Sequence, residues 1–188
     1  YDFTPPWPRV TYRDLILKDS GIDIDVINTE EKLLMEIKKT LRLRSGQAKV
    51  KLDLEGVVGF AALLDTFYKA VSRSKIVGPM FLTDYPAEML PLAKKKSDEP
   101  TKVASFQLLV NGGEWIKAYD ELNDPIDQRA RWEEEKNLAG KGLKEYQILD
   151  KDYIQALEYG MPPTAGWGFG IDRFVAFLTN QHTIKDTI

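Results

Sequence analysis

Apolar positions three and four residues apart predict several amphipathic helices in this chain. The clearest pattern runs from Val57 to Val71, where the apolar side chains would share one helical face. A second helix is predicted at residues 28–43, with Asn28 or Thr29 as its N-cap. A third follows the predicted N-cap Thr11, after an extended, proline-rich N-terminal segment.

Short apolar runs between these helices predict strands of an antiparallel sheet. Residues 78–86 read as a buried strand, and residues 102–122 as two strands around the turn Asn111–Gly113. Residues 165–170 predict a last strand that leads into a helix. The remaining helices are predicted at residues 124–142, with Asp124 as N-cap and Pro125 in the first turn, at 150–160 and at 171–181. The fold class is therefore α+β, an antiparallel sheet flanked by helices.

Composition bounds the kind of protein. The 188 residues are 43% hydrophobic and 29% charged, which is typical of a globular domain. There is no cysteine, and a single histidine, His182, cannot form a histidine-based metal site by itself. The longest apolar run, Val57–Leu64, is far too short to span a membrane, and no signal peptide is evident. We expect a cytoplasmic protein without a membrane partner.

The charge distribution is uneven although the formal net charge is only −3. Residues 38–51 contain six basic side chains and no acidic one. A solvated loop is the favoured interpretation of this basic stretch, and an RNA-facing patch is the alternative. The chain also begins without methionine and in the middle of a pattern, so we expect it to be part of a longer protein.

Three glycines at alternate positions, Gly166, Gly168 and Gly170, precede the predicted last helix. On a strand they would expose bare backbone on one face, and the helix that follows offers free N–H groups at its start. Arg173 would lie in the first turn, held by Asp172 and the backbone, where a planar guanidinium can clamp a nucleotide. The pattern suggests a floor for adenosine triphosphate, and tight packing is the alternative.

The predicted strand before residue 122 carries a second candidate constellation. Lys117, Tyr119 and Glu121 are spaced by two and would share one face, where a carboxylate beside a ring suits a cationic ligand. Glu114 would face the opposite side of a regular strand. It can join the same site only if a β-bulge lies near Trp115 or Ile116. An alternately charged, solvent-facing strand is the competing interpretation.

Three blocks in order resemble one enzyme family. In chain order they read FLTDYPAEMLPLAKK, AYDELNDPIDQRARWEEE and ALEYGMPPTAGWGFGIDRFVAFLTNQHTIKD. The last resembles motif 3 of class II aminoacyl-tRNA synthetases, specifically the lysyl-tRNA synthetases, and the first two resemble the segments that precede it. The resemblance implies a partial class II catalytic fold over residues 1–188. It also implies ATP-dependent activation of L-lysine with Mg²⁺, transfer to tRNA(Lys), and a homodimeric whole enzyme.

The resemblance also assigns roles to individual positions. It implies that ATP contacts Glu114, Gly170 and Arg173, with Arg173 as the catalytic residue. It implies that lysine contacts Gly168, Tyr119 and Glu121, the last of these receiving the side-chain ammonium. Magnesium would be associated with Glu114 and Glu121.

Several departures from the family pattern leave alternatives open. The family usually has a metal-associated acid at Gln107 and an asparagine at Lys117. Residues 42–52 read as an insertion or loop. Motifs 1 and 2 and an anticodon-binding domain have no counterpart in the 188 residues. A synthetase-like module that binds without catalysing is therefore one alternative. A paralogue that lysylates a protein is another.

Overall fold

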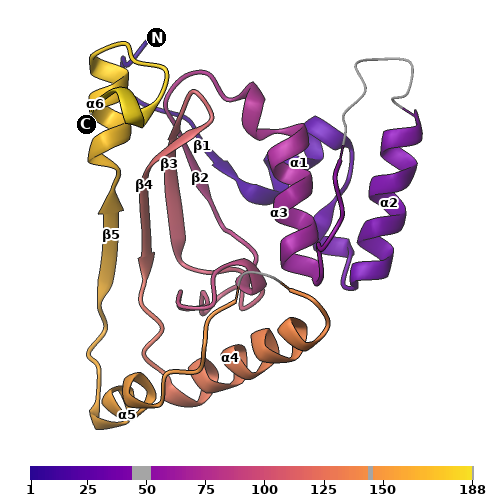
Figure 1. Cartoon of the computed structure of the whole chain (residues 1–188), viewed down its shortest axis with the longest axis vertical. Coiled ribbons are helices and arrows are strands. Elements are labelled where there is room, and N and C mark those ends of the chain that lie inside the picture. Colours follow the sequence, from indigo (N-terminus) through magenta and orange to yellow (C-terminus); the bar gives the residue numbers. More distant parts are fainter. Residues whose placement is uncertain (44–51, 144–145, 188) are drawn as a thin grey trace.

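A computed structural model describes residues 1–43, 52–143 and 146–187 of the chain (Figure 1). The expected insertion at 42–52 and the basic stretch 38–51 fall largely outside these residues. Five strands form one sheet in the order β1-β2-β3-β4-β5. The strands are β1 (Arg9–Thr11), β2 (Met80–Thr83), β3 (Ser105–Val110), β4 (Gly113–Asp120) and β5 (Ala165–Phe169).

The four strands β2 to β5 pair in antiparallel fashion, as the sequence predicts. The edge strand β1 pairs in parallel with β2, with Val10 opposite Leu82, so the sheet is mixed. The pattern did not predict β1 because it is three residues long and follows prolines. Its parallel direction arises because helices connect β1 to β2, and such a crossover returns the chain to the same end of the sheet.

Helices lie along one side of this sheet and at both ends of its strands (Figure 1). Three lie beside β1 and β2, namely α1 (Tyr12–Ser20), α2 (Glu30–Leu43) and α3 (Phe60–Val71). The others are α4 (Pro125–Gly140), α5 (Lys151–Tyr159) and α6 (Ile171–Leu178), and α6 continues directly from β5. Four short 3-10 helices complete the described elements, at Ile24–Val26, Arg73–Lys75, Ala87–Met89 and Ile184–Thr187. None of the helices in the described ranges is long and apolar enough to cross a membrane.

The helix starts follow the predicted capping chemistry. The Thr11 side chain accepts a hydrogen bond from the Asp14 N–H at 3.0 Å, and Thr29 accepts one from the Lys32 N–H at 3.3 Å. At α4 the carboxylate of Asp124 caps two N–H groups, and Pro125 occupies the first turn. These caps satisfy donors that have no partner within the helix.

The main core lies between α1–α3 and one face of the sheet. Its fully buried members come from both layers; Ile16, Leu33, Ile37, Leu64, Phe67, Leu82 and Leu109 are each at most 1% exposed. A second, aromatic cluster lies where the N-terminal segment meets α6. Phe3 stacks on Trp115 with ring centroids 5.9 Å apart and contacts Phe177 at 5.6 Å. The chain's first residues therefore hold α6 against the sheet.

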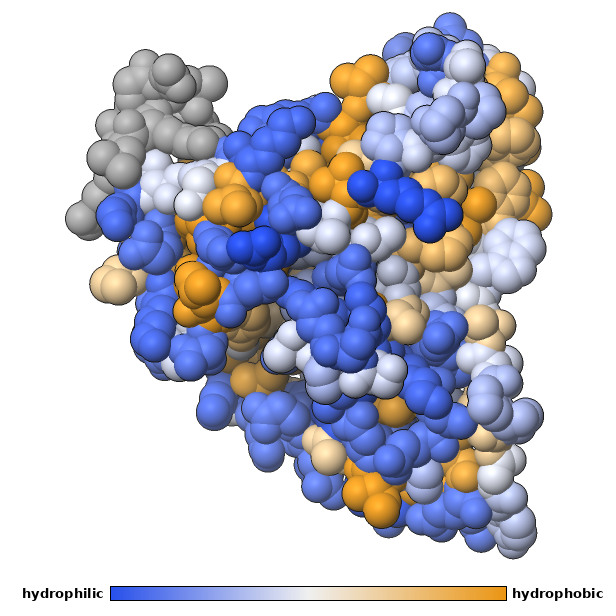
Figure 2. Space-filling view, turned by 180° about the vertical axis from the view of Figure 1, so that it is seen from behind, coloured by the Kyte–Doolittle hydropathy of each residue, from blue (hydrophilic) through white to orange (hydrophobic). Residues whose placement is uncertain are grey.

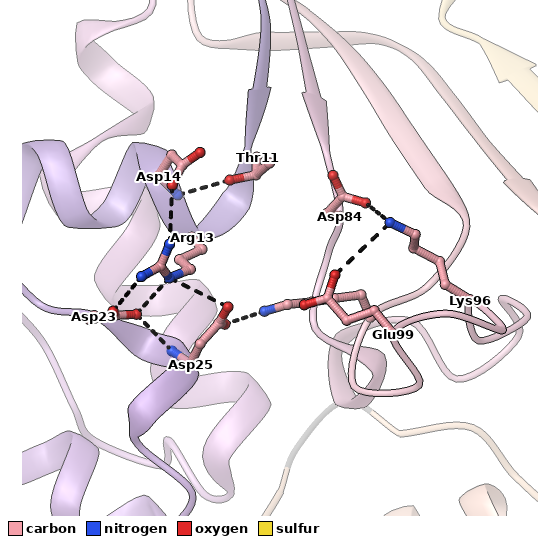
Figure 3. Close-up of polar contacts among 9 residues, drawn as sticks. Thr11, Arg13, Asp14, Asp23, Asp25, Asp84, Lys96 and Glu99 are labelled. Carbon is pink, nitrogen blue, oxygen red and sulfur yellow. Dashed lines mark hydrogen bonds and ion pairs between the residues drawn. The ribbon is translucent and has the colours of Figure 1, made fainter.

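A chain of ion pairs joins the helical layer to the loop before β3 (Figure 3). Arg13 donates to both carboxylate oxygens of Asp23, at 2.8 and 2.5 Å, and this bonding lowers the pKa of Asp23. Asp25 in turn bonds the ammonium of Lys102, a residue that is only 4% exposed. A buried ammonium needs such a partner because water does not reach it.

Replacing Asp25 with asparagine should therefore destabilise the fold. The change removes the carboxylate that bonds the buried Lys102 ammonium, at a cost of about 2 kcal/mol, or roughly 4–8 °C in Tm. This is less than for a fully buried pair, since the Asp25 side chain is 32% exposed. The matched control Glu99→Gln removes an exposed carboxylate 4.0 Å from Lys96 and should cost less than about 0.5 kcal/mol. Equal unfolding free energies for the two variants would contradict this reading.

Candidate functional site

The β3–β4 hairpin contains one extra residue in its second strand. Its turn residues Asn111 and Gly112 have φ values of 50° and 67°, the combination that a tight two-residue hairpin turn requires. Beyond the turn, Leu109 pairs with Glu114 and Leu108 pairs with Ile116, so Trp115 has no counterpart on β3. This is the β-bulge near Trp115 that Glu114 would need in order to share a face with Glu121.

The bulge brings Glu114 onto the face that carries Lys117 and Tyr119. Without the extra residue, strand alternation would place Glu114 on the opposite side. Burial raises the pKa of Tyr68 on α3, and the nearby charge of Glu114 adds to the increase, so Tyr68 lies over this face. We call this side of the sheet the site face, defined by Gln107, Glu114, Lys117, Tyr119 and Glu121.

The bulge also positions the start of α6. The N–H of Gly170 donates to the Trp115 carbonyl at 2.8 Å, and Nη1 of Arg173 donates to the Glu114 carbonyl at 2.8 Å. The Trp115 ring packs edge-on against Phe177 at 4.9 Å. Arg173 is thus held by the β4 backbone, and the described contacts include no ion pair with Asp172. Its exposed guanidinium projects beside the site face.

The glycines of β5 turn out to have different roles. A Cβ at Gly166 would lie 2.5 Å from Oε1 of Glu121, so this glycine makes room for the carboxylate. A Cβ at Gly168 would meet no atom within 4 Å, so the backbone there is open to a ligand. A Cβ at Gly170 would lie 3.6 Å from Cδ of Arg173, so this glycine is in contact with the arginine side chain. The alternate spacing therefore serves both packing and open space.

Glu121 lies at the far end of β4 in a partly buried setting. Its N–H donates to the Thr164 carbonyl at 2.9 Å, which fixes its backbone beside β5. Burial raises the pKa of its carboxyl above the usual 4.5. Within the part of the chain that the structure describes, no side chain forms an ion pair with this carboxylate. A half-buried carboxylate in this state favours a cationic ligand.

Two phenol rings lie near Glu121. Burial raises the pKa of the Tyr119 and Tyr153 hydroxyls, and the negative charge of Glu121 raises both further. The sequence pattern marks Tyr119 but not Tyr153, which comes from α5. Only the packing of α5 on α4, where the Tyr153 ring lies 5.5 Å from that of Trp132, brings Tyr153 to the site. The pair offers ring faces to a cation or an alkyl chain.

The two predicted magnesium-associated acids are not brought together. Glu114 is the second residue of β4 and Glu121 follows its end, so they lie roughly 20 Å apart along the strand. Gln107 and Lys117 are direct cross-strand partners between them, and neither is a hard anionic donor. In residues 1–43, 52–143 and 146–187 there is no group of three or more histidine, aspartate or glutamate side chains that could hold a metal ion.

A cavity of about 370 Å³ adjoins the middle of the site face. Gln107 and Lys117 form its floor on the sheet, and Asp65, Glu88 and Glu135 contribute carboxylates from the surrounding elements. Asp65 is bonded to Lys69 at 2.6 Å, and burial raises the pKa of Glu135. The site face therefore combines a carboxylate end at Glu121, an arginine end at Arg173 and a polar cavity between them.

Sequence comparison assigns this architecture to a family. The chain belongs to the class II tRNA synthetases of the D, K and N group, whose family model matches residues 1–188. A mixed sheet with flanking helices agrees with part of such a catalytic domain.

Individual relatives are more specific. The chain is similar to a protein named lysine–tRNA ligase from Porphyromonas gingivalis, with 41% identity over 187 residues. Proteins of the same name from Thermosipho africanus and Pelotomaculum thermopropionicum share 42% and 37% identity. Each alignment covers 100% of this chain, and the chain spans 30% to 35% of these relatives.

The contact between Gly166 and Glu121 yields a test of the site geometry. Gly166→Ala should displace the Glu121 carboxylate toward solvent, because its Oε1 lies 2.5 Å from the new methyl position. The raised pKa of Glu121 should then return toward 4.5, as measured by NMR titration of the side-chain carboxyl. Gly168→Ala is the matched control and should leave the titration unchanged. An unshifted pKa in Gly166→Ala would show that Glu121 is not packed against β5 as described.

Proposed function

We propose that this chain carries the lysine-recognition and ATP-binding half of a lysine–tRNA ligase active site. The observation that carries the proposal is the half-buried Glu121 carboxylate, which faces two phenol rings and has no described counter-ion. Its raised pKa indicates that a ligand bearing positive charge would restore the favourable ionised state. The relatives named lysine–tRNA ligase support L-lysine as that ligand.

Lysine would lie along the site face with its ammonium at Glu121. Tyr119 would flank the alkyl stem, and the backbone at Gly168 would line the open path toward the other end of the site. The Glu121 carboxylate would determine specificity. It would form an ion pair with the side-chain ammonium of lysine, whereas an uncharged amino acid would leave the partly buried carboxylate without a partner.

ATP would lie at the Arg173 end. The guanidinium, held by the Glu114 carbonyl, would contact the nucleotide, and the start of α6 at Gly170 would add its N–H groups and dipole. A lysine carboxylate oxygen would attack the α-phosphorus in line, and the bond to the departing pyrophosphate would break. No general base is required, so the residues act by positioning and by stabilising charge.

Magnesium is expected with ATP, but the described donors do not fit a magnesium site held by the chain. Among the residues that define the site face, Glu114 supplies the carboxylate at that end, and its neighbours are the neutral Gln107 and the cationic Lys117. Mg²⁺ usually enters such sites through carboxylates together with substrate phosphates.

The remaining partners follow from the same proposal. In the whole protein the activated lysine would pass to tRNA(Lys), in a homodimer located in the cytoplasm. An apolar surface over β5 and α6 supports an interface with another subunit, because Trp167, Ile171 and Leu178 are each more than 60% exposed (Figure 2).

The second candidate function is a binding module without catalysis, which the residues Gln107 and Lys117 favour.

Lysine-dependent exchange of pyrophosphate into ATP tests the catalytic proposal directly. We expect this chain alone to show little or no exchange, because its 188 residues contain no counterpart of the motif 2 arginine that contacts the α-phosphate. The protein extended to the length of its relatives should exchange with lysine and not with leucine. Absence of exchange in the extended protein, with lysine binding retained, would favour the non-catalytic binding module.

Two substitutions separate the ends of the site. Glu121→Gln removes the charge partner and should weaken lysine binding about 10- to 100-fold, with ATP binding unchanged. Arg173→Ala should weaken ATP binding by a similar factor and leave lysine binding unchanged. Calorimetric titration with each ligand measures both. Asp120→Asn, one residue away at an exposed position, is the control, and equal losses for lysine and leucine would argue against the Glu121 role.

The pH dependence of lysine binding should follow the same carboxyl. Lysine binds the ionised form, so affinity falls as pH drops through the pKa of Glu121 in the free protein. Because burial raises that pKa, the loss should begin at a higher pH than an ordinary carboxyl with a pKa of 4.5 would give.

A further inference from the structure

Gln107 and Lys117 are two parts of one local arrangement. They are direct cross-strand partners on β3 and β4, and both line the cavity beside the site face. Lys117 is also the cross-strand partner of Gly168 on β5. Lys117 therefore has the neutral amide of Gln107 on one side and the backbone of Gly168 on the other. A Cβ added at Gly168 would meet no atom within 4 Å.

The charges at this point of the site face are unusual for a metal site. Glu114 contributes one negative charge, Gln107 none and Lys117 one positive charge, so the three side chains are neutral together. A divalent cation next to an ammonium would be repelled, and an amide oxygen attracts it far less than a carboxylate does. The arrangement instead supplies its own fixed positive charge, which an anionic group can use.

The cavity acids compete for the Lys117 ammonium, but two of them are already engaged. Asp65 is bonded by Lys69 at 2.6 Å, and Glu135 accepts a hydrogen bond from the Gln147 N–H at 3.1 Å. Burial raises the pKa of Glu135, which weakens its hold on a cation. Glu88 remains as the competitor in the cavity, and Glu114 as the competitor on the sheet. The long, flexible lysine stem can leave either one for a multiply charged phosphate.

We propose that Lys117 binds the phosphates of ATP and takes the place of a divalent ion held by the chain. This inference rests on the proposed nucleotide site at Arg173 and goes beyond it. Lys117 and Arg173 would contact the nucleotide from the two sides of the open backbone at Gly168. ATP binding by this protein should then depend little on Mg²⁺.

Calorimetric titration of ATP into the chain, with excess EDTA and with excess MgCl₂, tests the proposal. The wild-type affinities in the two conditions should agree within about threefold. Lys117→Asn should lose about 10-fold in EDTA, the loss expected for one charge-assisted contact. Lys117→Arg, which keeps the charge, should retain most of the affinity. Lys136→Asn, an exposed position on α4, is the control for the change in net charge.

The double variant Gln107→Glu/Lys117→Asn provides the opposite arm. It replaces the neutral set with two carboxylates, so its ATP affinity should become strongly dependent on MgCl₂. A wild-type protein that binds ATP only with MgCl₂, or a Lys117→Asn variant with unchanged affinity in EDTA, would overturn the role of Lys117 alone. A wild-type protein that binds ATP in neither condition would overturn the proposed nucleotide site, and this inference with it.

Discussion

The extra residue at Trp115 in β4 is the constraint on which the site depends. A bulge leaves a local gap in the β3–β4 ladder, and here the Glu114 and Trp115 carbonyls accept hydrogen bonds from Arg173 and Gly170 at the start of α6. One backbone irregularity therefore moves Glu114 to the site face, fixes the start of α6 at Gly170 and holds the Arg173 guanidinium. The Trp115 ring, 8% exposed, packs the same point against Phe3 and Phe177. Geometry of this kind is maintained only because packing and hydrogen bonds both select it.

The far end of the site works by a different principle. Glu121 is a carboxyl whose burial raises its pKa, so the folded state binds its proton more tightly than the unfolded chain does. Such a group destabilises the fold at neutral pH, and the destabilisation disappears as pH falls through its raised pKa. A group that opposes folding is more plausibly explained by binding than by stability. The glycine at Gly166 is consistent with this reading, because it makes room for the carboxylate.

The scaffold joins these tasks along β3 and β4. The main core beneath α1–α3 and the Arg13–Asp23–Asp25–Lys102 chain stabilise the β1–β3 side of the sheet. The site extends from Gln107 on β3 across β4 to β5, where the backbone is open at Gly168. Tyr119 of the site face also packs against the main core, so the packing that stabilises the sheet positions this side of the site as well.

Local chemistry in the sequence determined much of this structure. Helical periodicity, the caps at Thr11, Thr29 and Asp124, and the Asn111–Gly112 turn were all readable, because each depends on residues a few positions apart. The bulge was inferred only as a condition for Glu114 and Glu121 to share a face. Tertiary structure alone decided that Tyr153 joins Glu121, that Gly166 accommodates a carboxylate while Gly168 stays open, and that Lys117 faces Gln107. The parallel pairing of β1 also belongs to this group. These features depend on which strands and helices become neighbours, and strand register and helix packing are set by contacts between residues far apart in the chain.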